Sequence, residues 1–248
     1  MTRAAPAGAS VARAGAGHDA VARETALVLL LQMKRSARLW GALRLVVGRF
    51  ALRRVPGLAF FKVLGSGHEG GFGLRPSADR LGLFALFADE AAADRFVAAS
   101  PVMQAWAAHA RECAWLKLAC CSARGAWAGR ALVVRGEPPA DGPIAVLTRA
   151  SIRPRSAFAF WRLSPAAEHA LIDTPGCRLA TGLGEAPLLR QATFSVWRDA
   201  ASVEAYARHG PHLAAARAAY QHGWFAESLF ARFVVLDQGG RWKGRDLG

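Results

Sequence analysis

The stretches Phe84-Ala85-Leu86-Phe87-Ala88-Asp89 and Phe194-Ser195-Val196-Trp197-Arg198-Asp199 decide the fold of this chain. Each is a mostly apolar run that ends in an acidic residue and opens into a helix-like segment. The two runs lie 110 residues apart. Self-similarity on this scale indicates two copies of one supersecondary unit within a single chain.

The duplication extends to both sides of these runs. Residues 63–67 match 180–184 at a spacing of 117, and residues 112–118 match 227–233 at a spacing of 115. Small insertions therefore separate two otherwise parallel halves. We interpret positions of like character in both halves as scaffold, namely the pairs Lys117 and Arg232, Glu112 and Glu227, and Trp127 and Trp242. Polar residues that occur in only one half are the candidates for function.

Each half predicts the element order β-α-β-β-α-β of a ferredoxin-like unit. In the second half the predicted elements are strand 144–150, helix 156–169, strand 177–182 closed by a Gly182-Leu183-Gly184 turn, strand 191–197, helical segments over 200–220 and strand 228–236. In the first half they are 26–33, 38–50, 59–64, 81–87, 89–110 and 115–121.

The predicted fold class is therefore α+β, with two tandem ferredoxin-like units. An apolar sheet face cannot remain exposed to water, so we expect the open faces of the two sheets to pack together as an α+β barrel with a cavity between them. The predicted boundaries are a disordered tail over 1–22, a first unit over 23–136, a Gly/Pro linker over 137–143 and a second unit over 144–248.

Composition limits the class of protein. No apolar run reaches about 18 residues, the length that a spanning helix needs. The tail lacks the apolar core of a secretory signal, and the four cysteines, two of them adjacent, do not indicate a disulfide framework. These features favour a cytoplasmic protein.

The formal net charge of +14 favours polyanionic partners. No nucleic-acid-binding motif accompanies the charge, so a membrane surface or an acidic electron donor ranks above nucleic acid. The excess of arginine is equally consistent with a GC-rich genome.

His212 is the first telling difference between the halves, because Gly210-Pro211-His212 corresponds to Ser100-Pro101-Val102. The shared proline suits the first turn of a helix. Near a helix N-terminus the positive end of the dipole disfavours imidazolium, which leaves a neutral nitrogen able to bind a metal. A surface or hydrogen-bonded structural histidine fits the same sequence.

Arg149 is the second difference, since a spacing of 118 places it opposite Leu31. A lone arginine among apolar strand residues, if buried, has to be paired or to face an anion such as a cofactor carboxylate. Alternatively, its side of the strand is solvated.

The chain lacks a serine nucleophile elbow, a Cys-His arrangement, paired catalytic carboxylates and a dinucleotide fingerprint. An apolar barrel, many aromatic residues and one half-specific histidine suit a hydrophobic substrate and a metal-bearing cofactor.

Several ordered segments resemble one family. They are 61–67, 145–150, 182–187, 191–197, Gly210-Pro211-His212, 223–227 and 231–233. Together they resemble the spheroidene monooxygenases, the carotenoid ketolases of purple photosynthetic bacteria, over roughly residues 27–244.

The resemblance implies a haem b oxygenase that introduces a keto group into an acyclic carotenoid with oxygen and reduced ferredoxin. On this hypothesis His212 is the axial iron ligand, Arg149 pairs with a haem propionate, and Gln191, Thr193 and Phe194 line the substrate pocket. The basic surface would contact anionic membrane lipid and attract an acidic ferredoxin. The open alternatives are a cofactor-free monooxygenase of the antibiotic-biosynthesis type, and a non-catalytic protein that binds haem or another apolar ligand.

Overall fold

The computed structural model describes residues 23–71, 75–137, 139, 141–172, 174–186, 188–208 and 210–248. The side chains of Glu69, residues 164–170, Ile172, Pro211 and His212 are not part of this description. The predicted disordered tail, residues 1–22, lies outside the described residues.

Two β-α-β-β-α-β units follow one another along the chain, as predicted. The first consists of β1 (Thr25–Met33), α2 (Arg38–Leu52), β2 (Leu58–Gly67), β3 (Pro76–Phe87), α3 (Glu90–Ala99), α4 (Pro101–His109) and β4 (Ala110–Gly125). The second consists of β5 (Ile144–Ile152), α5 (Ala157–Ile172), β6 (Cys177–Ala186), β7 (Arg190–Trp197), α6 (Ala200–Arg208), α7 (Gly210–Gln221) and β8 (Phe225–Trp242), with β9 (Arg245–Asp246) at the end. Short 3-10 helices occupy Arg35–Ala37, His68–Gly70 and Pro154–Ser156.

The predicted Gly182-Leu183-Gly184 turn is wrong, because β6 runs through it to Ala186. Gly184 pairs with Gly65 of β2, and a Cβ on Gly184 would lie only 3.2 Å from the Arg190 carbonyl oxygen. The glycines therefore serve close backbone approach within the sheet rather than chain reversal.

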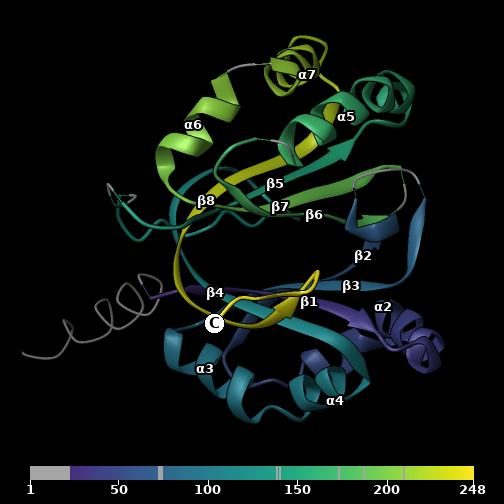
Figure 1. Cartoon of the computed structure of the whole chain (residues 1–248), viewed down its shortest axis with the longest axis vertical. Coiled ribbons are helices and arrows are strands. Elements are labelled where there is room, and N and C mark those ends of the chain that lie inside the picture. The colour runs from purple at the N-terminus through teal and green to yellow at the C-terminus, as the bar shows by residue number, and fades with distance from the viewer. Residues whose placement is uncertain are drawn as a thin grey trace, which may run out of the picture.

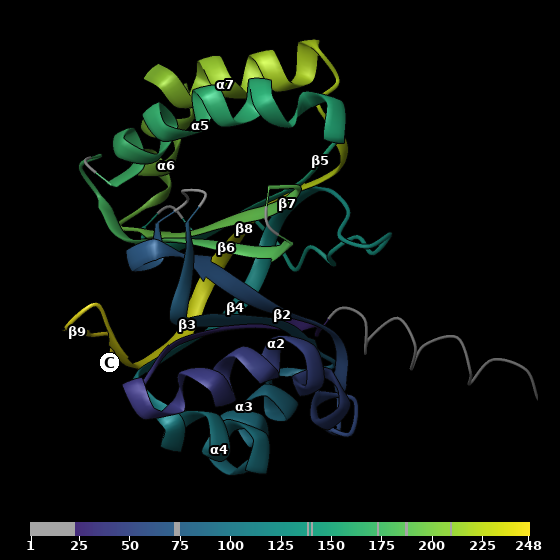
Figure 2. The ribbon, with the colours of Figure 1, turned by 90° about the vertical axis from the view of Figure 1, so that its right-hand side faces the viewer.

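The strands form one closed ring, in the order β4-β1-β3-β2-β6-β7-β5-β8, with β8 pairing back to β4. The two joints between the halves differ in length. The β4–β8 ladder has eleven register pairs, whereas β2 and β6 share only two, Gly65 with Gly184 and Ser66 with Leu183. Figures 1 and 2 show the two sheets face to face, with α2, α3 and α4 outside one and α5, α6 and α7 outside the other.

Strand alternation separates two layers of core. Val28 and Leu30 of β1 point into the barrel, where they pack with residues such as Phe84, Phe194 and Phe233 from both halves. This interior is filled by buried side chains. Among the described residues, large apolar side chains from both sheets interdigitate where the sequence predicted a cavity, so this part of the structure does not meet that prediction.

The positions interpreted as scaffold hold the halves together. The Glu112 carboxylate accepts hydrogen bonds from the backbone N–H groups of Lys243 (2.8 Å) and Gly244 (2.9 Å). Glu227 does the same for Ala128 (3.1 Å) and Gly129 (2.9 Å). Each half thus supports the C-terminal turn of the other.

Lys117 and Arg232 also have matching roles. Each extends from its sheet to the helix layer outside it, Lys117 to Asp94 of α3 at 2.6 Å and Arg232 to Glu204 of α6 at 2.5 Å. The structure therefore gives both pairs equivalent positions.

Candidate active site

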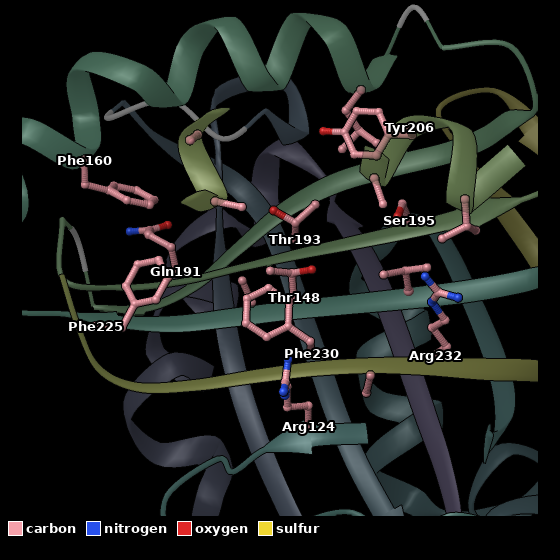
Figure 3. A pocket seen from close by; sticks show the side chains of 18 of the residues that line it. Arg124, Thr148, Phe160, Gln191, Thr193, Ser195, Tyr206, Phe225, Phe230 and Arg232 are labelled. Carbon is pink, nitrogen blue, oxygen red and sulfur yellow. The ribbon is translucent and has the colours of Figure 1, made fainter. Parts of the chain in front are cut away.

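A cavity of about 550 Å³ lies between the second sheet and α5, α6 and α7 (Figure 3). Its size falls within the range of small-molecule sites. Aromatic side chains supply much of its wall: Phe160, Trp161, Trp197, Trp224, Phe225 and Phe230. The cavity is on the outer face of the sheet, opposite the barrel interior.

Comparison of the two halves shows how this space arises. In the first half, Leu29 of β1 lies opposite Leu83 of β3, and both are fully buried under the helices. In the second half the equivalent cross-strand pair is Thr148 and Thr193, and both line the cavity. Two large apolar side chains are thus replaced by two smaller hydroxyl-bearing ones.

The helix layer changes in the same direction. Trp106 of α4 is 2% exposed and fills the helix-to-sheet layer of the first half. At the spacing of 110, its counterpart in α7 is Ala216, which lines the cavity. Ala216 borders the cavity, so the described side chains leave open part of the volume that the indole fills in the first half.

The polar groups of the cavity come from the sheet. Thr148, Gln191, Thr193 and Ser195 all lie on its floor, and Figure 3 shows Thr148 and Thr193 near its centre. Trp197 donates its indole N–H to Ser195 Oγ at 2.9 Å, which fixes that hydroxyl. The cavity therefore combines apolar walls with a small polar floor.

Tyr206 of α6 adds a phenol to the wall. Burial raises the pKa of this phenol, and the nearby Cys177 adds to the shift. Tyr206 therefore remains neutral at physiological pH.

Two arginines line the cavity, and they differ in whether they pair with a carboxylate of the described residues. Arg232 is held by Glu204. Arg124, at the end of β4, has no carboxylate partner within the described part of the chain, and Figure 3 shows it pointing toward Phe230. Its guanidinium is available to an anionic group at the edge of the cavity.

The structure brings two of the three predicted pocket residues together. Gln191 and Thr193 line the cavity. Phe194 is fully buried in the barrel interior, because successive residues of β7 point to opposite faces. Phe194 therefore does not line this cavity, whereas its neighbours Thr193 and Ser195 do.

Arg149 lies on the barrel side of β5, away from the cavity. The ladders pair Leu30 with Gly82 and Arg149 with Ala192, so the residue equivalent to Arg149 is Leu30 rather than Leu31. Its side chain is 4% exposed and pairs with Glu227 and, at 3.1 Å, with Glu185.

The Glu185 carboxylate joins this network to the first half. It accepts the Trp127 indole N–H at 2.7 Å and lies 3.1 Å from Lys62 Nζ. Burial raises the pKa of Glu185, but the Trp127 hydrogen bond and the charges of Lys62 and Arg149 outweigh burial and lower it. The arginine is buried and paired, as one sequence-based alternative required, and its anions are glutamates of this chain.

His212 is the third residue of α7, close to the helix N-terminus as predicted. Position 212 precedes Ala215 and Ala216 by three and four residues, so it shares their helix face, and both alanines line the cavity. The His212 side chain itself lies outside the description.

The described residues hold no group of three or more His, Cys, Asp or Glu side chains arranged for a metal ion. Sequence reasoning missed Thr148, Arg124 and Ala216. The duplication contained the signal for Thr148 and Ala216, since each replaces a large apolar residue of the first half.

The fold is a tandem ferredoxin-like α+β barrel with a largely apolar cavity in its second half. Among solved structures, an aldoxime dehydratase in complex with butyraldoxime superposes with a TM-score of 0.57 at 13% identity, over 88% of this chain and 81% of that one. This similarity shows the shared fold.

Sequence comparison with curated proteins gives the family. The chain is 51% identical to the spheroidene monooxygenase of Rubrivivax gelatinosus, over 90% of this chain and 86% of the relative. It is 39% identical to that of Rhodobacter capsulatus, over 84% and 88%. No protein-family model matches the chain. This chain belongs to the spheroidene monooxygenase family.

Proposed function

We propose that this protein is a haem-dependent monooxygenase that introduces a keto group into an acyclic carotenoid, with oxygen and electrons from reduced ferredoxin. One observation supports this most strongly. The helix-to-sheet layer that is packed in the first half is replaced in the second by a cavity of about 550 Å³.

The carotenoid assignment rests on the family and on the chemistry of the cavity. The relatives are named for spheroidene. A polyene presents apolar edges and π faces, which suit walls that carry Phe160, Trp161 and Phe225. These walls would exclude water and orient the polyene so that one of its carbons faces the polar floor.

Two residues, one on α7 and one at the end of β4, support haem as the cofactor. Position 212 precedes Ala215 and Ala216, which line the cavity, by three and four residues, and its imidazole would hold the iron. Arg124, which pairs with no carboxylate among the described residues, would bind a propionate, the role that the sequence suggested for Arg149. A haem bound here would supply the oxygen activation that hydroxylation of an allylic C–H bond requires.

Ketone formation requires two hydroxylations at the same carbon. Each consumes one O₂, two electrons and two protons, places one hydroxyl on the substrate and releases one water. The resulting geminal diol loses water to give the ketone. Thr148, Thr193 and Gln191 line the cavity, and they would donate hydrogen bonds to the oxygen on the hydroxylated carbon and so hold the alcohol for the second step.

The proposed location is the cytoplasm, with peripheral contact to membrane. The described helices all fall short of the length or apolar content that crossing a bilayer requires. The net charge of +14 would attract both anionic lipid and an acidic ferredoxin.

Absorption and turnover of the purified protein test the proposal. We expect a Soret band that is lost in His212→Ala. The control is His109→Ala, which changes a histidine at the end of the equivalent helix α4 and should retain the band. We also expect reduced ferredoxin and oxygen to convert an acyclic carotenoid to its ketone.

Each alternative gives a different result. Turnover by a colourless protein would favour the cofactor-free mechanism. A haem protein that binds carotenoid without turnover would be a binding protein. A Soret band that survives in His212→Ala would contradict the proposed ligand.

A further inference from the structure

The outer face of α2 is unusually apolar for an exposed helix. Leu39, Leu43, Val46 and Phe50 follow one another at spacings of four, three and four residues, so they form one stripe along the helix. Their exposed fractions are 74%, 48%, 61% and 53%. The opposite face packs on the sheet, and Gly48 and Leu52 are buried there.

This concentration of exposed apolar surface is specific to α2. Among the described residues, six of the twelve exposed large hydrophobic side chains lie on this helix. Single exposed hydrophobic residues are ordinary, but a continuous stripe marks an interaction surface.

The flanks of the stripe are strongly basic. Residues 34–54 contain seven Lys or Arg residues and no Asp or Glu. Lys34, Arg35, Arg49, Arg53 and Arg54 are exposed. A helix with this composition is typical of segments that lie in the interface of an anionic bilayer.

The charge favours lipid over a second copy of this chain. A symmetric dimer through α2 would place two such basic segments against each other, which would cost electrostatic free energy. A bilayer that contains anionic lipid complements the same charge.

Another side of the same helix lies close to the candidate active site. Leu45 of α2 lines a second cavity of about 200 Å³. This cavity lies at the short β2–β6 joint, where Ser66 and Leu183 pair, and it shares Trp161 and Gln191 with the main cavity. Figure 2 shows α2 on the side of the molecule where β2 meets β6.

We propose that the outer face of α2 is a docking surface for anionic membrane, and that it brings the β2–β6 joint close to the lipid from which an apolar substrate is taken. The docking surface is defined by Leu39, Leu43, Val46, Val47 and Phe50 with the flanking basic residues. The delivery of substrate at the β2–β6 joint rests on the proposed function, because it assumes a substrate that dissolves in membrane lipid.

Vesicle flotation of the full chain tests the docking surface directly. Wild type is expected to bind vesicles that contain phosphatidylglycerol and phosphatidylcholine, and to bind pure phosphatidylcholine vesicles about tenfold more weakly. Leu39→Ser/Val46→Ser is expected to reduce partition into the mixed vesicles at least tenfold. The matched control is Leu236→Ser/Val134→Ser, the same exposed residue types away from α2, which should bind as wild type does.

A charge variant separates the basic flank from the stripe. Arg49→Gln/Arg53→Gln should lose most of its preference for the anionic vesicles, and added salt should have the same effect on wild type. The proposal is overturned if wild type does not bind the mixed vesicles. It is also overturned if the Leu39→Ser/Val46→Ser variant binds them as well as the control does. Light scattering that shows a dimer in wild type and a monomer in the α2 variant would overturn it too, since a second copy would then cover the stripe.

Turnover distinguishes this proposal from the function proposed above. With carotenoid in detergent micelles, the α2 variant should work at the wild-type rate, while with carotenoid in vesicles its rate should fall in proportion to binding. Vesicle binding without any turnover would support the docking surface and contradict the oxygenase. Equal rates of wild type and variant on vesicles would contradict the delivery role of α2.

Discussion

Two threonines in the second half occupy positions where the first half has leucines. Thr148 and Thr193 are cross-strand neighbours on the cavity floor, and the equivalent Leu29 and Leu83 are fully buried in the first half. The same backbone positions therefore support either a packed core or a pocket. Side-chain volume and polarity at these positions make the difference.

Thr148→Leu/Thr193→Leu should convert the pocket floor to the packed state. Each added leucine buries apolar surface worth about 1 to 2 kcal/mol. The melting temperature should therefore rise by several degrees, while carotenoid turnover falls more than tenfold. Thermal unfolding by circular dichroism and product analysis check the two effects.

The reverse change in the first half is the control. Leu29→Thr/Leu83→Thr removes buried methyl groups from a filled layer and should cost several kcal/mol in free energy of unfolding. If the threonine-to-leucine variant lost stability to the same extent, the cavity floor would already be as tightly packed as the first half.

At the scale of elements, α4 and α7 show the same contrast. α4 lies on its sheet through Met103 and Trp106, both buried. α7 lies beside α5 and contributes Ala215 and Ala216 to the cavity. The side chains of α4 fill the layer between helix and sheet, whereas α7 covers the cavity.

Ala216→Trp should place in α7 the indole that α4 has at the equivalent position. We expect ligand binding to fall more than tenfold with little loss of stability, since the indole enters existing space. Titration with carotenoid or haem, followed by absorbance, measures the loss. Ala214→Trp, at an exposed position two residues earlier on the same helix, should bind as wild type does. Equal binding by both variants would contradict a cavity beneath α7.

The elements themselves could be predicted from the sequence, because apolar periodicity and the internal repeat specify strands and helices locally. The Gly182 to Gly184 segment could not, since glycine marks a turn and a close strand contact equally well. Gln191 and Thr193 were assigned to the pocket, but Phe194 was assigned with them. Only the register shows which face of β7 each residue occupies.

At the scale of the whole molecule, an ionic network joins the halves inside the barrel. Arg149, Glu185 and Glu227 come from the second half, and Lys62 and Trp127 from the first. Burial raises the pKa of Glu227, but backbone N–H groups of Gly129 and Ala128 and the charge of Arg149 outweigh it and lower it. Both glutamates therefore bind protons less readily when the chain is folded.

Acid should weaken the fold through this network. A lowered carboxyl pKa contributes stability above the unfolded value, near 4.5, and that stability is lost as pH falls through the folded value. Arg149→Leu, which introduces the residue found at the equivalent Leu30, should cost about 3 kcal/mol at pH 7. It should also flatten the decline in free energy of unfolding between about pH 5 and pH 3.

Urea unfolding at several pH values measures both effects. Arg241→Leu removes an exposed arginine outside the network and should keep the wild-type pH profile. A profile for Arg149→Leu that runs parallel to wild type would show that Arg149 does not set the two pKa values.

The tandem barrel could also be predicted at this scale, whereas the location of the cavity could not. Two open apolar faces must pack together, but whether they leave a space depends on side-chain volumes summed across both sheets. The residue spacing that aligns β1 with β5 could not be fixed from the sequence either. An error of one residue there exchanges the interior and exterior faces of the strand and so moves Arg149 from one to the other.

The ring of eight strands closes on itself through β4 and β8. A closed ring satisfies the backbone donors and acceptors that an outermost strand would otherwise leave available to a neighbouring molecule. Crowding many copies together should therefore not add strands at the β4–β8 joint. Any growth by sheet extension would have to begin at the β2–β6 joint, where the described strands share only two register pairs.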